Sequence, residues 1–136
     1  NSPQRLGNLH PNIAPYGEIF KTKDDKQITF AIGSNRHFVD LCSSLQLDII
    51  EEQDFATNQL RVQNREKLET LIQQKVKHVD SNQLMNKLHH LNVPCAFIKN
   101  IKEVLDSKMS QDLIRSESID GEPTSRITSI GFKWID

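Results

Sequence analysis

The chain has 136 residues, a length typical of one domain with its own hydrophobic core. Its 17 basic and 18 acidic side chains give a formal net charge of −1, which provides no electrostatic signature of nucleic-acid or anionic-membrane binding. No apolar run is long enough to cross a bilayer and no stretch reads as a signal peptide, so we expect a cytoplasmic protein.

The first seventeen residues predict an extended segment. Three of the five prolines and two glycines fall in it: Pro3, Pro11, Pro15, Gly7 and Gly17. Proline fixes its own backbone and biases the preceding residue toward extended conformations. We therefore predict an inter-domain linker at residues 1–17 and one domain at residues 18–136. His10 beside Pro11 could be a catalytic or ligand histidine, but no metal-ligand set accompanies it.

Residues 18–32 predict a β-hairpin. Its second strand shows apolar residues in strict alternation, which is typical of a half-buried strand: Ile28, Phe30 and Ile32. The charged stretch at residues 21–26 separates the two strands and is interpreted as a solvated turn. Asp24 and Asp25 in this turn are adjacent on an exposed tip, so we do not interpret them as an acid/base pair.

Gly33 ends this strand, and a helix is expected to start directly after it, capped by Ser34 or Asn35. A glycine between a strand and a helix lets the backbone approach a ligand closely, and the free amides of a helix start favour anions. The simpler interpretation is a tight strand-to-helix connection, because a single glycine is a weak phosphate signal.

Apolar residues at helical spacing predict three helices, near residues 35–46, 58–78 and 81–91. Their expected buried faces are Phe38, Leu41, Cys42 and Leu45 in the first, Leu68, Leu71, Ile72, Val76 and Val79 in the second, and Leu84, Met85, Leu88 and Leu91 in the third. The expected caps are Thr57 or Asn58 for the second helix and Asp80 or Ser81 for the third. Basic residues of the second helix, including Arg61 and Arg65, alternate with glutamates, which predicts a solvated face with ion pairs.

The remaining sequence predicts a short strand at residues 95–98, a short fourth helix near 101–105, and closing strands around a polar loop at 120–123. The last of these strands would carry the apolar residues Ile127, Ile130, Phe132, Trp134 and Ile135. The order ββ-ααα-β-α-ββ indicates an α+β fold, with a small antiparallel sheet packed with about four helices after an extended linker.

The sequence offers little catalytic chemistry of its own. It contains no nucleophile elbow, no Walker loop, no dinucleotide fingerprint and no zinc-ligand spacing, so we predict neither a catalytic residue nor a metal site. Cys42 and Cys95 are far apart, and we interpret them as buried thiols of a reducing cytoplasm, with a disulfide as the alternative. The first residue is Asn1 rather than Met, so we expect a piece of a longer protein.

Blocks along the chain match the ordered signatures of one enzyme family. They are Arg5-Leu-Gly-Asn-Leu-His-Pro-Asn-Ile-Ala-Pro-Tyr-Gly17; Phe30-Ala-Ile-Gly-Ser-Asn-Arg-His-Phe38; Asp54-Phe-Ala-Thr-Asn58 with Arg61-Val62 and Asn64-Arg65; and Asn92-Val-Pro-Cys-Ala96 with Glu103-Val104. In this order the blocks resemble the linker, the glycine turn, the most specific signature and a further motif of the family III CoA-transferases, the carnitine CoA-transferase/formyl-CoA transferase superfamily.

The resemblance implies that the chain is the small, lid domain of such an enzyme together with its linker. In that family the nucleophile is an Asp of a larger domain encoded before the linker. It attacks an acyl-CoA thioester and passes coenzyme A, through covalent intermediates, to a second carboxylic acid. The resemblance further implies a homodimer, and a glycine turn that faces the acyl-CoA. The implied substrate-binding residues are Gly33, Ser34, Asn35 and Arg36. The chain alone should be inactive.

The glycine turn also departs from the family pattern. Ser34-Asn35 stands where transferases commonly have Asn-Asp, and a single glycine stands where formyl-CoA transferase has a run of them, so formyl or oxalate specificity is not supported. The related acyl-CoA racemases carry a Glu in this turn, and none lies between Gly33 and Phe38, which favours a transferase. The racemase branch and a non-catalytic interaction domain stay open as alternatives.

Overall fold

The predicted hairpin supplies two strands of a three-stranded antiparallel sheet in the computed structural model, which describes residues 7–128. Strand β1 (Tyr16–Lys21) pairs with β2 (Gln27–Ala31), and β2 pairs with β3 (Cys95–Phe97), in the order β1-β2-β3. The alternating residues of the second strand are all at most 1% exposed: Ile28, Phe30 and Ile32. Alternation in the sequence therefore correctly identified the face of the sheet that the core covers.

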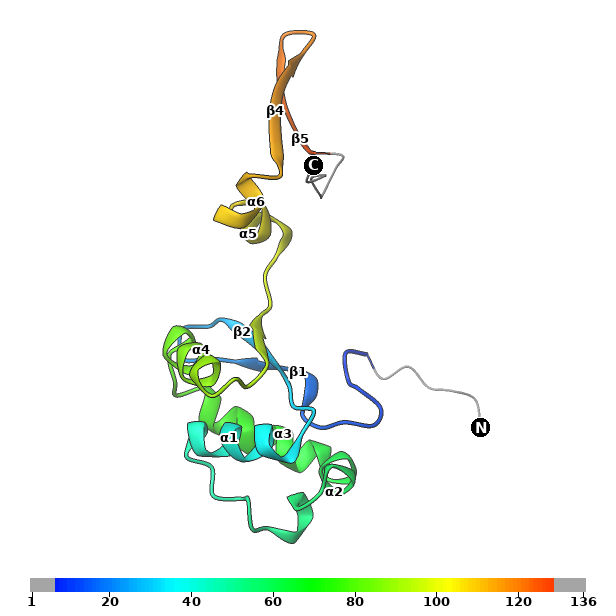
Figure 1. Ribbon diagram of the computed structural model, residues 1–136, viewed down its shortest axis with the longest axis vertical. Coiled ribbons are helices and arrows are strands. Elements are labelled where there is room, and N and C mark those ends of the chain that lie inside the picture. The colour runs from blue at the N-terminus through cyan, green and yellow to red at the C-terminus, as the bar shows by residue number, and fades with distance from the viewer. Residues whose placement is uncertain (1–6, 129–136) are drawn as a thin grey trace, which may run out of the picture. The chain divides into compact units, whose positions relative to one another are not determined.

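Three longer helices cover this face: α1 (Asn35–Leu45), α3 (Arg65–Val76) and α4 (Ser81–His90). Figure 1 shows α1 beside α3, and α1 also contacts α4, while α3 contacts β1 and α4 contacts β3. The buried side chains of these helices and the sheet form one core, which includes Phe20, Phe38, Leu41, Leu45, Leu68, Ile72, Leu84 and Leu88. Ser34 caps α1, Asp80 caps α4 and Thr57 caps the helix that begins at Asn58, each among the predicted caps.

The single helix predicted over residues 58–78 is wrong, because two helices occupy that range. Helix α2 (Asn58–Gln63) ends at Asn64, whose backbone leaves the helical region with φ −103° and ψ 27°, and α3 begins at Arg65. The Asn64 side-chain amide donates to the carbonyl oxygens of Leu60 at 3.0 Å and Asp54 at 3.2 Å. An asparagine side chain that bonds nearby backbone competes with helix propagation, and here it also holds the short 3₁₀ helix η1 (Gln53–Phe55).

The hairpin turn is only partly the solvated tip that its charges suggested. Asp24 accepts hydrogen bonds from the Ser81 amide at 2.9 Å, the Ser81 hydroxyl at 2.6 Å and the Thr22 hydroxyl at 2.8 Å. These bonds, with the Ser81 hydroxyl first, lower the pKa of Asp24 from 3.8 to about 2. Asp24 therefore joins the hairpin turn to the start of α4, whereas Asp25 pairs with Lys21 at the surface.

Two units make up the chain: unit 1 ends at Ile98 and unit 2 begins at Lys99. Unit 2 contains α5 (Ile101–Leu105), α6 (Lys108–Gln111), β4 (Ile114–Ile119) and β5 (Glu122–Ile127). The sequence analysis expected one small antiparallel sheet, but within residues 7–128 strands β4 and β5 pair with each other and form a second sheet. Asp120 and Gly121 form their turn with φ of 52° and 86°, so Asp-Gly acts as a two-residue hairpin turn.

None of the described residues of unit 2, 99–128, is buried. A two-stranded hairpin and helices of five and four residues cannot enclose a core of their own. The apolar residues expected at the end of the closing strand lie outside the described residues: Ile130, Phe132, Trp134 and Ile135. The α+β fold class is confirmed, and the buried hydrophobic residues among those that the structure describes all belong to unit 1.

Both cysteines are free thiols, so the alternative of a disulfide between them is wrong. Cys42 is fully buried on α1, and burial raises the pKa of its thiol to about 12. Cys95 is only half-buried, which corrects the expectation of two buried thiols, and burial raises its pKa as well. A thiol with a raised pKa is a poor nucleophile, which agrees with a structural role for both.

Candidate functional site

The glycine turn, Gly33–Arg36, connects the end of β2 to the first turn of α1. Ser34 is the N-cap, and its side-chain oxygen accepts from the His37 amide at 3.2 Å. At Gly33, an added Cβ would meet no atom within 4 Å, and its φ does not lie in the left-handed region. The chain itself therefore does not require a glycine here, and open space lies in front of this backbone.

The two remaining side chains of the turn have different surroundings. Asn35 accepts a hydrogen bond through Oδ1 from Arg61 Nη2 at 2.8 Å, so its side chain serves the fold. Arg36 is 84% exposed, and its Nε lies 3.8 Å from Asp40 Oδ2. The turn thus presents backbone, the positive end of the α1 dipole and one exposed guanidinium, a combination that attracts a carboxylate or phosphate.

The interpretation of Arg61 as part of a solvated face is wrong, because this side chain is only 1% exposed. Its Nε donates to the Ala14 carbonyl at 3.2 Å, its Nη1 to the Phe55 carbonyl at 3.0 Å and its Nη2 to Asn35. The guanidinium also lies over the Phe38 ring, 4.4 Å from the centroid. One arginine therefore touches the linker, η1, the glycine turn and α1.

Within residues 7–128, no carboxylate forms a salt bridge with Arg61, and its charge is met by neutral oxygens and an aromatic ring. Burial lowers the pKa of this guanidinium, with Cys42 acting in the opposite direction. Arginine stays protonated even so, because its pKa starts above about 12. Arg61 is thus a buried cation held by carbonyl dipoles, an arrangement that depends on each of its acceptors.

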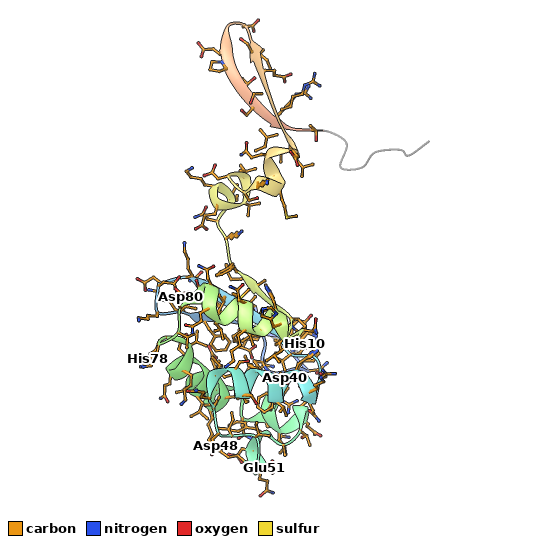
Figure 2. The ribbon with its side chains drawn as sticks, turned by 60° about the vertical axis from the view of Figure 1, so that its left-hand side comes forward. His10, Asp40, Asp48, Glu51, His78 and Asp80 are labelled. Atoms are coloured by element: carbon orange, nitrogen blue, oxygen red, sulfur yellow. The ribbon has the colours of Figure 1, made fainter. Side chains whose placement is uncertain are left out.

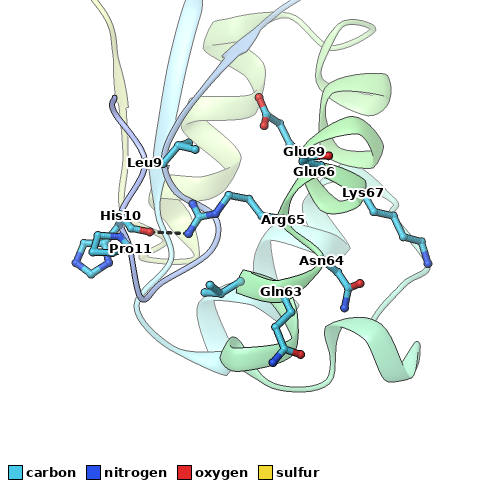
Figure 3. Close-up of a pocket in the computed structure, with 10 residues that line it drawn as sticks. Leu9, His10, Pro11, Gln63, Asn64, Arg65, Glu66, Lys67 and Glu69 are labelled. Atoms are coloured by element: carbon cyan, nitrogen blue, oxygen red, sulfur yellow. Dashed lines mark hydrogen bonds between the residues drawn. The ribbon is translucent and has the colours of Figure 1, made fainter. Parts of the chain in front are cut away.

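The interpretation is also wrong for Arg65, whose side chain is 13% exposed. Its Nη1 forms an ion pair with buried Glu18, and its Nη2 donates to the carbonyl oxygens of His10 and Ile13. Figure 3 shows this side chain extending from α3 to the His10 carbonyl. Arg65 therefore holds backbone that lies some fifty residues before it in the sequence, just ahead of β1.

Asn58 completes the attachment. Its side-chain nitrogen donates to the Asn12 carbonyl at 2.7 Å, and its Oδ1 accepts from the Ala14 amide at 3.2 Å. We call residues 7–15 the arm. The arm has neither helix nor strand, but the predicted extended segment ends too late, because Tyr16 and Gly17 already belong to β1. The arm is held against the helices of unit 1, and its Ala14 is fully buried. Composition alone suggested no such anchor.

The signal that sequence reasoning missed is the spacing of these three residues. Asn58, Arg61 and Arg65 stand at positions i, i+3 and i+7, which share one face of a helix despite the break at Asn64. All three belong to the block that resembles the most specific signature of the family. In this structure that signature binds the arm.

A pocket of about 680 Å³ lies between the arm and helices α2 and α3. Its lining residues are Leu9, His10, Pro11, Val62, Gln63, Asn64, Arg65, Glu66, Lys67 and Glu69 (Figure 3). Arg65 is engaged as described, and Lys67 pairs with Asp54 at 2.8 Å and with Glu52 at 3.4 Å. The two basic side chains of the lining are thus already paired, and the acidic Glu66 and Glu69 line the same pocket. The pocket is therefore a poor electrostatic match for the phosphates of coenzyme A.

Titratable side chains do not gather into a second site. Figure 2 shows histidine and carboxylate side chains spread over different elements of unit 1: His10, Asp40, Asp48, Glu51, His78 and Asp80. His10 Nδ1 accepts from the Asn12 amide at 3.1 Å, which is a local turn contact. Among residues 7–128, no group of three potential metal ligands is found. In the same range, no helix combines the length and the apolar character needed to span a membrane.

Comparison with known proteins gives a consistent picture. The sequence profile described as CoA-transferase family III matches residues 1–133. The chain is 32% identical over 102 residues to succinyl-CoA:glutarate CoA-transferase of Homo sapiens, covering 74% of this chain and 23% of the human protein. It is 33% identical over 103 residues to succinate–glutarate CoA-transferase of Agrobacterium fabrum, covering 75% of this chain and 25% of that protein.

A solved structure shows the same similarity in three dimensions. The crystal structure of a CAIB/BAIF family protein from Brucella suis aligns over 97% of this chain with a TM-score of 0.82 and 31% identity. The alignment covers 34% of the Brucella chain. The chain thus spans about a quarter of the length of the curated relatives named above and about a third of this crystallised protein.

Proposed function

The chain belongs to CoA-transferase family III, and from that membership we propose that it works as the small domain of an acyl-CoA:carboxylate CoA-transferase. In this proposal it closes over an acyl-CoA site whose nucleophilic Asp belongs to a larger domain of the same polypeptide. The observation that carries the proposal is the alignment of nearly the whole chain with only a third of a crystallised family protein.

The relatives also support a substrate class. They include proteins named succinyl-CoA:glutarate and succinyl-CoA:mesaconate CoA-transferases. We therefore propose that coenzyme A moves between short dicarboxylic acids, with an acyl-CoA thioester as donor and a free carboxylate as acceptor. No metal takes part in this proposal. The longer protein would act as a cytoplasmic homodimer.

The glycine turn would supply this chain's contribution. A dicarboxylyl thioester carries a second carboxylate, and Arg36 is an exposed cation beside the start of α1. Open space at Gly33 allows a bound thioester to approach the backbone. Ser34 and Asn35 set the backbone of the turn through the cap and through Arg61. The chain's role is to position and enclose the substrate, while the upstream Asp forms the covalent bonds.

The test compares the longer protein with the 136-residue chain. The longer protein is expected to convert succinyl-CoA and glutarate to glutaryl-CoA and succinate, whereas the chain alone should show no transfer and at most weak binding of coenzyme A. One wall of a cleft gives little net affinity, because immobilising the ligand has its own entropic cost. Submicromolar binding of coenzyme A by the chain alone would contradict the proposal.

Two other outcomes would select the alternatives. Proton exchange at the acyl α-carbon without transfer of coenzyme A would identify the racemase branch. A longer protein that lacks the upstream Asp and catalyses neither reaction would identify an interaction domain. The absence of Glu between Gly33 and Phe38 favours the transferase over the racemase.

A further inference from the structure

Arg61 is placed to connect the arm with the glycine turn. Its guanidinium donates at the same time to Ala14 in the arm, to Phe55 in η1 and to Asn35 in the turn. Ala14 and Asn35 are not neighbours in the sequence, and the buried Arg61 side chain connects them by donating a hydrogen bond to each. A single rigid group therefore bridges the chain's two candidate functional segments.

We propose that Arg61 is a positioning residue that couples the position of the arm to the conformation of the glycine turn. The proposal rests on the proposed function, in which the arm leads to the larger domain and the turn faces the acyl-CoA. Movement of the larger domain would reach the arm first. Through Arg61 it would then bias the turn between conformations that do and do not fit the substrate.

The guanidinium suits this role for physical reasons. Its nitrogen atoms are coplanar, so its hydrogen bonds to Ala14 and Asn35 have fixed relative directions. The Phe38 ring lies 4.4 Å from it and limits motion out of that plane. Because the side chain is 1% exposed, water is not available to replace a lost partner. A shift of the arm must therefore either move the turn or break a buried hydrogen bond.

Arg65 provides a matched comparison. It is also an arginine on the same helical face, and it also binds arm carbonyls, at His10 and Ile13. Its other partner is Glu18 on β1, so the hydrogen bonds of Arg65 go to the arm and to β1 and not to the glycine turn. Replacing Arg65 should therefore loosen the arm and leave the turn unchanged, whereas replacing Arg61 should affect both.

The first test measures amide hydrogen exchange in the 136-residue chain. With Arg61→Lys, the amides of Ala14 and Phe38 are expected to exchange about tenfold faster or more, since each reports a segment that loses a buried hydrogen bond. With Arg65→Lys, the arm amides alone should accelerate. Equal protection of Phe38 in the two variants would overturn the coupling.

A second pair of variants works from the other end and applies even if Arg61→Lys does not fold. Coupling is reciprocal, so Asn35→Ala should accelerate exchange at Ala14, although the side-chain hydrogen bond of Asn35 is to Arg61 and not to the arm. Ser34→Ala removes the cap of the same helix and leaves the Asn35–Arg61 bond in place. Ser34→Ala should leave Ala14 exchange unchanged. Unchanged Ala14 exchange in Asn35→Ala would reject the proposal.

The third test uses transferase kinetics of the longer protein. Arg61→Lys and Asn35→Ala should each lower kcat about tenfold, with a smaller change in KM for the acyl-CoA, and the double variant should be no slower than the slower single one. When Arg65→Lys is combined with Asn35→Ala in the same way, the effects of the two substitutions on kcat should multiply, so their free energies should be additive. Additivity in the Arg61 cycle would contradict the coupling. A wild-type protein without transfer activity whose exchange experiments still show coupling would refute only the proposed function.

Discussion

At the scale of single residues, the most informative side chain is one that the sequence pattern placed on the surface. Arg61 is a buried cation with carbonyl and amide acceptors. A charge in this setting is tolerated because several dipoles and an aromatic ring surround it. The resemblance places an Asp in transferases where this chain has Asn35. Asn35 is the side-chain acceptor of Arg61, whereas its other acceptors are backbone carbonyls, so an Asp here would make the interaction ionic.

Asn35→Asp should therefore stabilise the chain. The Asn35 oxygen already lies 2.8 Å from Arg61 Nη2, so a carboxylate there would form a charge-assisted bond without rearrangement. The expected gain in the free energy of unfolding is about 1 kcal/mol, the difference between charged and neutral hydrogen bonds. Urea denaturation at pH 7 measures it, with the same substitution in an Arg61→Lys background as the control. An unchanged or lower midpoint would show that the acceptor charge does not matter at this site.

Gly33→Val separates a folding requirement from a functional one. Because no atom lies within 4 Å of the position of an added Cβ, the free energy of unfolding of the variant should lie within about 0.5 kcal/mol of the wild-type value. In the longer protein the same side chain should crowd the substrate and lower kcat/KM at least about tenfold. Ile72→Ala, at a fully buried core position, is the contrasting variant and should cost about 3 kcal/mol of stability. An active Gly33→Val transferase would remove the turn from the substrate site.

At the scale of elements, side-chain hydrogen bonds at the ends of helices decide how the pieces join. Asp24 binds the first residue of α4 from a turn 57 positions earlier in the sequence. Asn64 divides one expected helix into α2 and α3. In both cases a short polar side chain bonds backbone amides or carbonyls at a helix end or a helix break.

The contact between Asp24 and α4 predicts a pH dependence of stability. Its pKa is lowered from 3.8 in the unfolded chain to about 2 in the folded chain, so the folded state favours the ionised form. The stabilisation is therefore fully present above about pH 4 and is lost as the pH falls from about 4 to about 2. Urea unfolding of the wild type and of Asp24→Asn across this range measures the difference. The two curves should converge at low pH, and a gap that widens on acidification would contradict this sign.

At the scale of the whole molecule, the two units have unequal means of stabilisation. Unit 1 buries a continuous core, whereas residues 99–128 of unit 2 include no buried residue. Several apolar side chains of unit 2 are largely exposed: Ile101 at 80%, Met109 at 86% and Ile127 at 64%. Short helices and a two-stranded hairpin without a core are marginal in water.

Limited trypsin digestion should reveal this difference. Cleavage in the native chain is expected first in unit 2 or at the junction, for example after Lys99 or Lys102, and should leave a resistant fragment containing β1 to β3. Mass spectrometry of early digestion products identifies the sites. Early cuts within α3, whose Lys75 is also available to trypsin, would show that unit 1 is not the more stable unit.

The sequence by itself determined the elements whose patterns are local. Alternation at Ile28, Phe30 and Ile32 predicted the hairpin, and helical spacing from Phe38 to Leu45 predicted α1 with its Ser34 cap. The ordered blocks also identified the family. The hairpin and the helix depend on residues within a few positions of one another, where backbone geometry imposes a fixed period.

Only the tertiary structure decided which polar residues are buried and what they bind. Arg61 lies 47 positions from its partner Ala14, and Asp24 lies 57 positions from its partner Ser81. No short window of sequence therefore contains both members of either pair. A charged side chain is buried only where folding brings enough acceptors to it, and its own neighbours in sequence carry no record of them. For that reason the Arg61 and Arg65 positions looked like solvated helix surface, whereas in the folded chain they hold the arm against the domain.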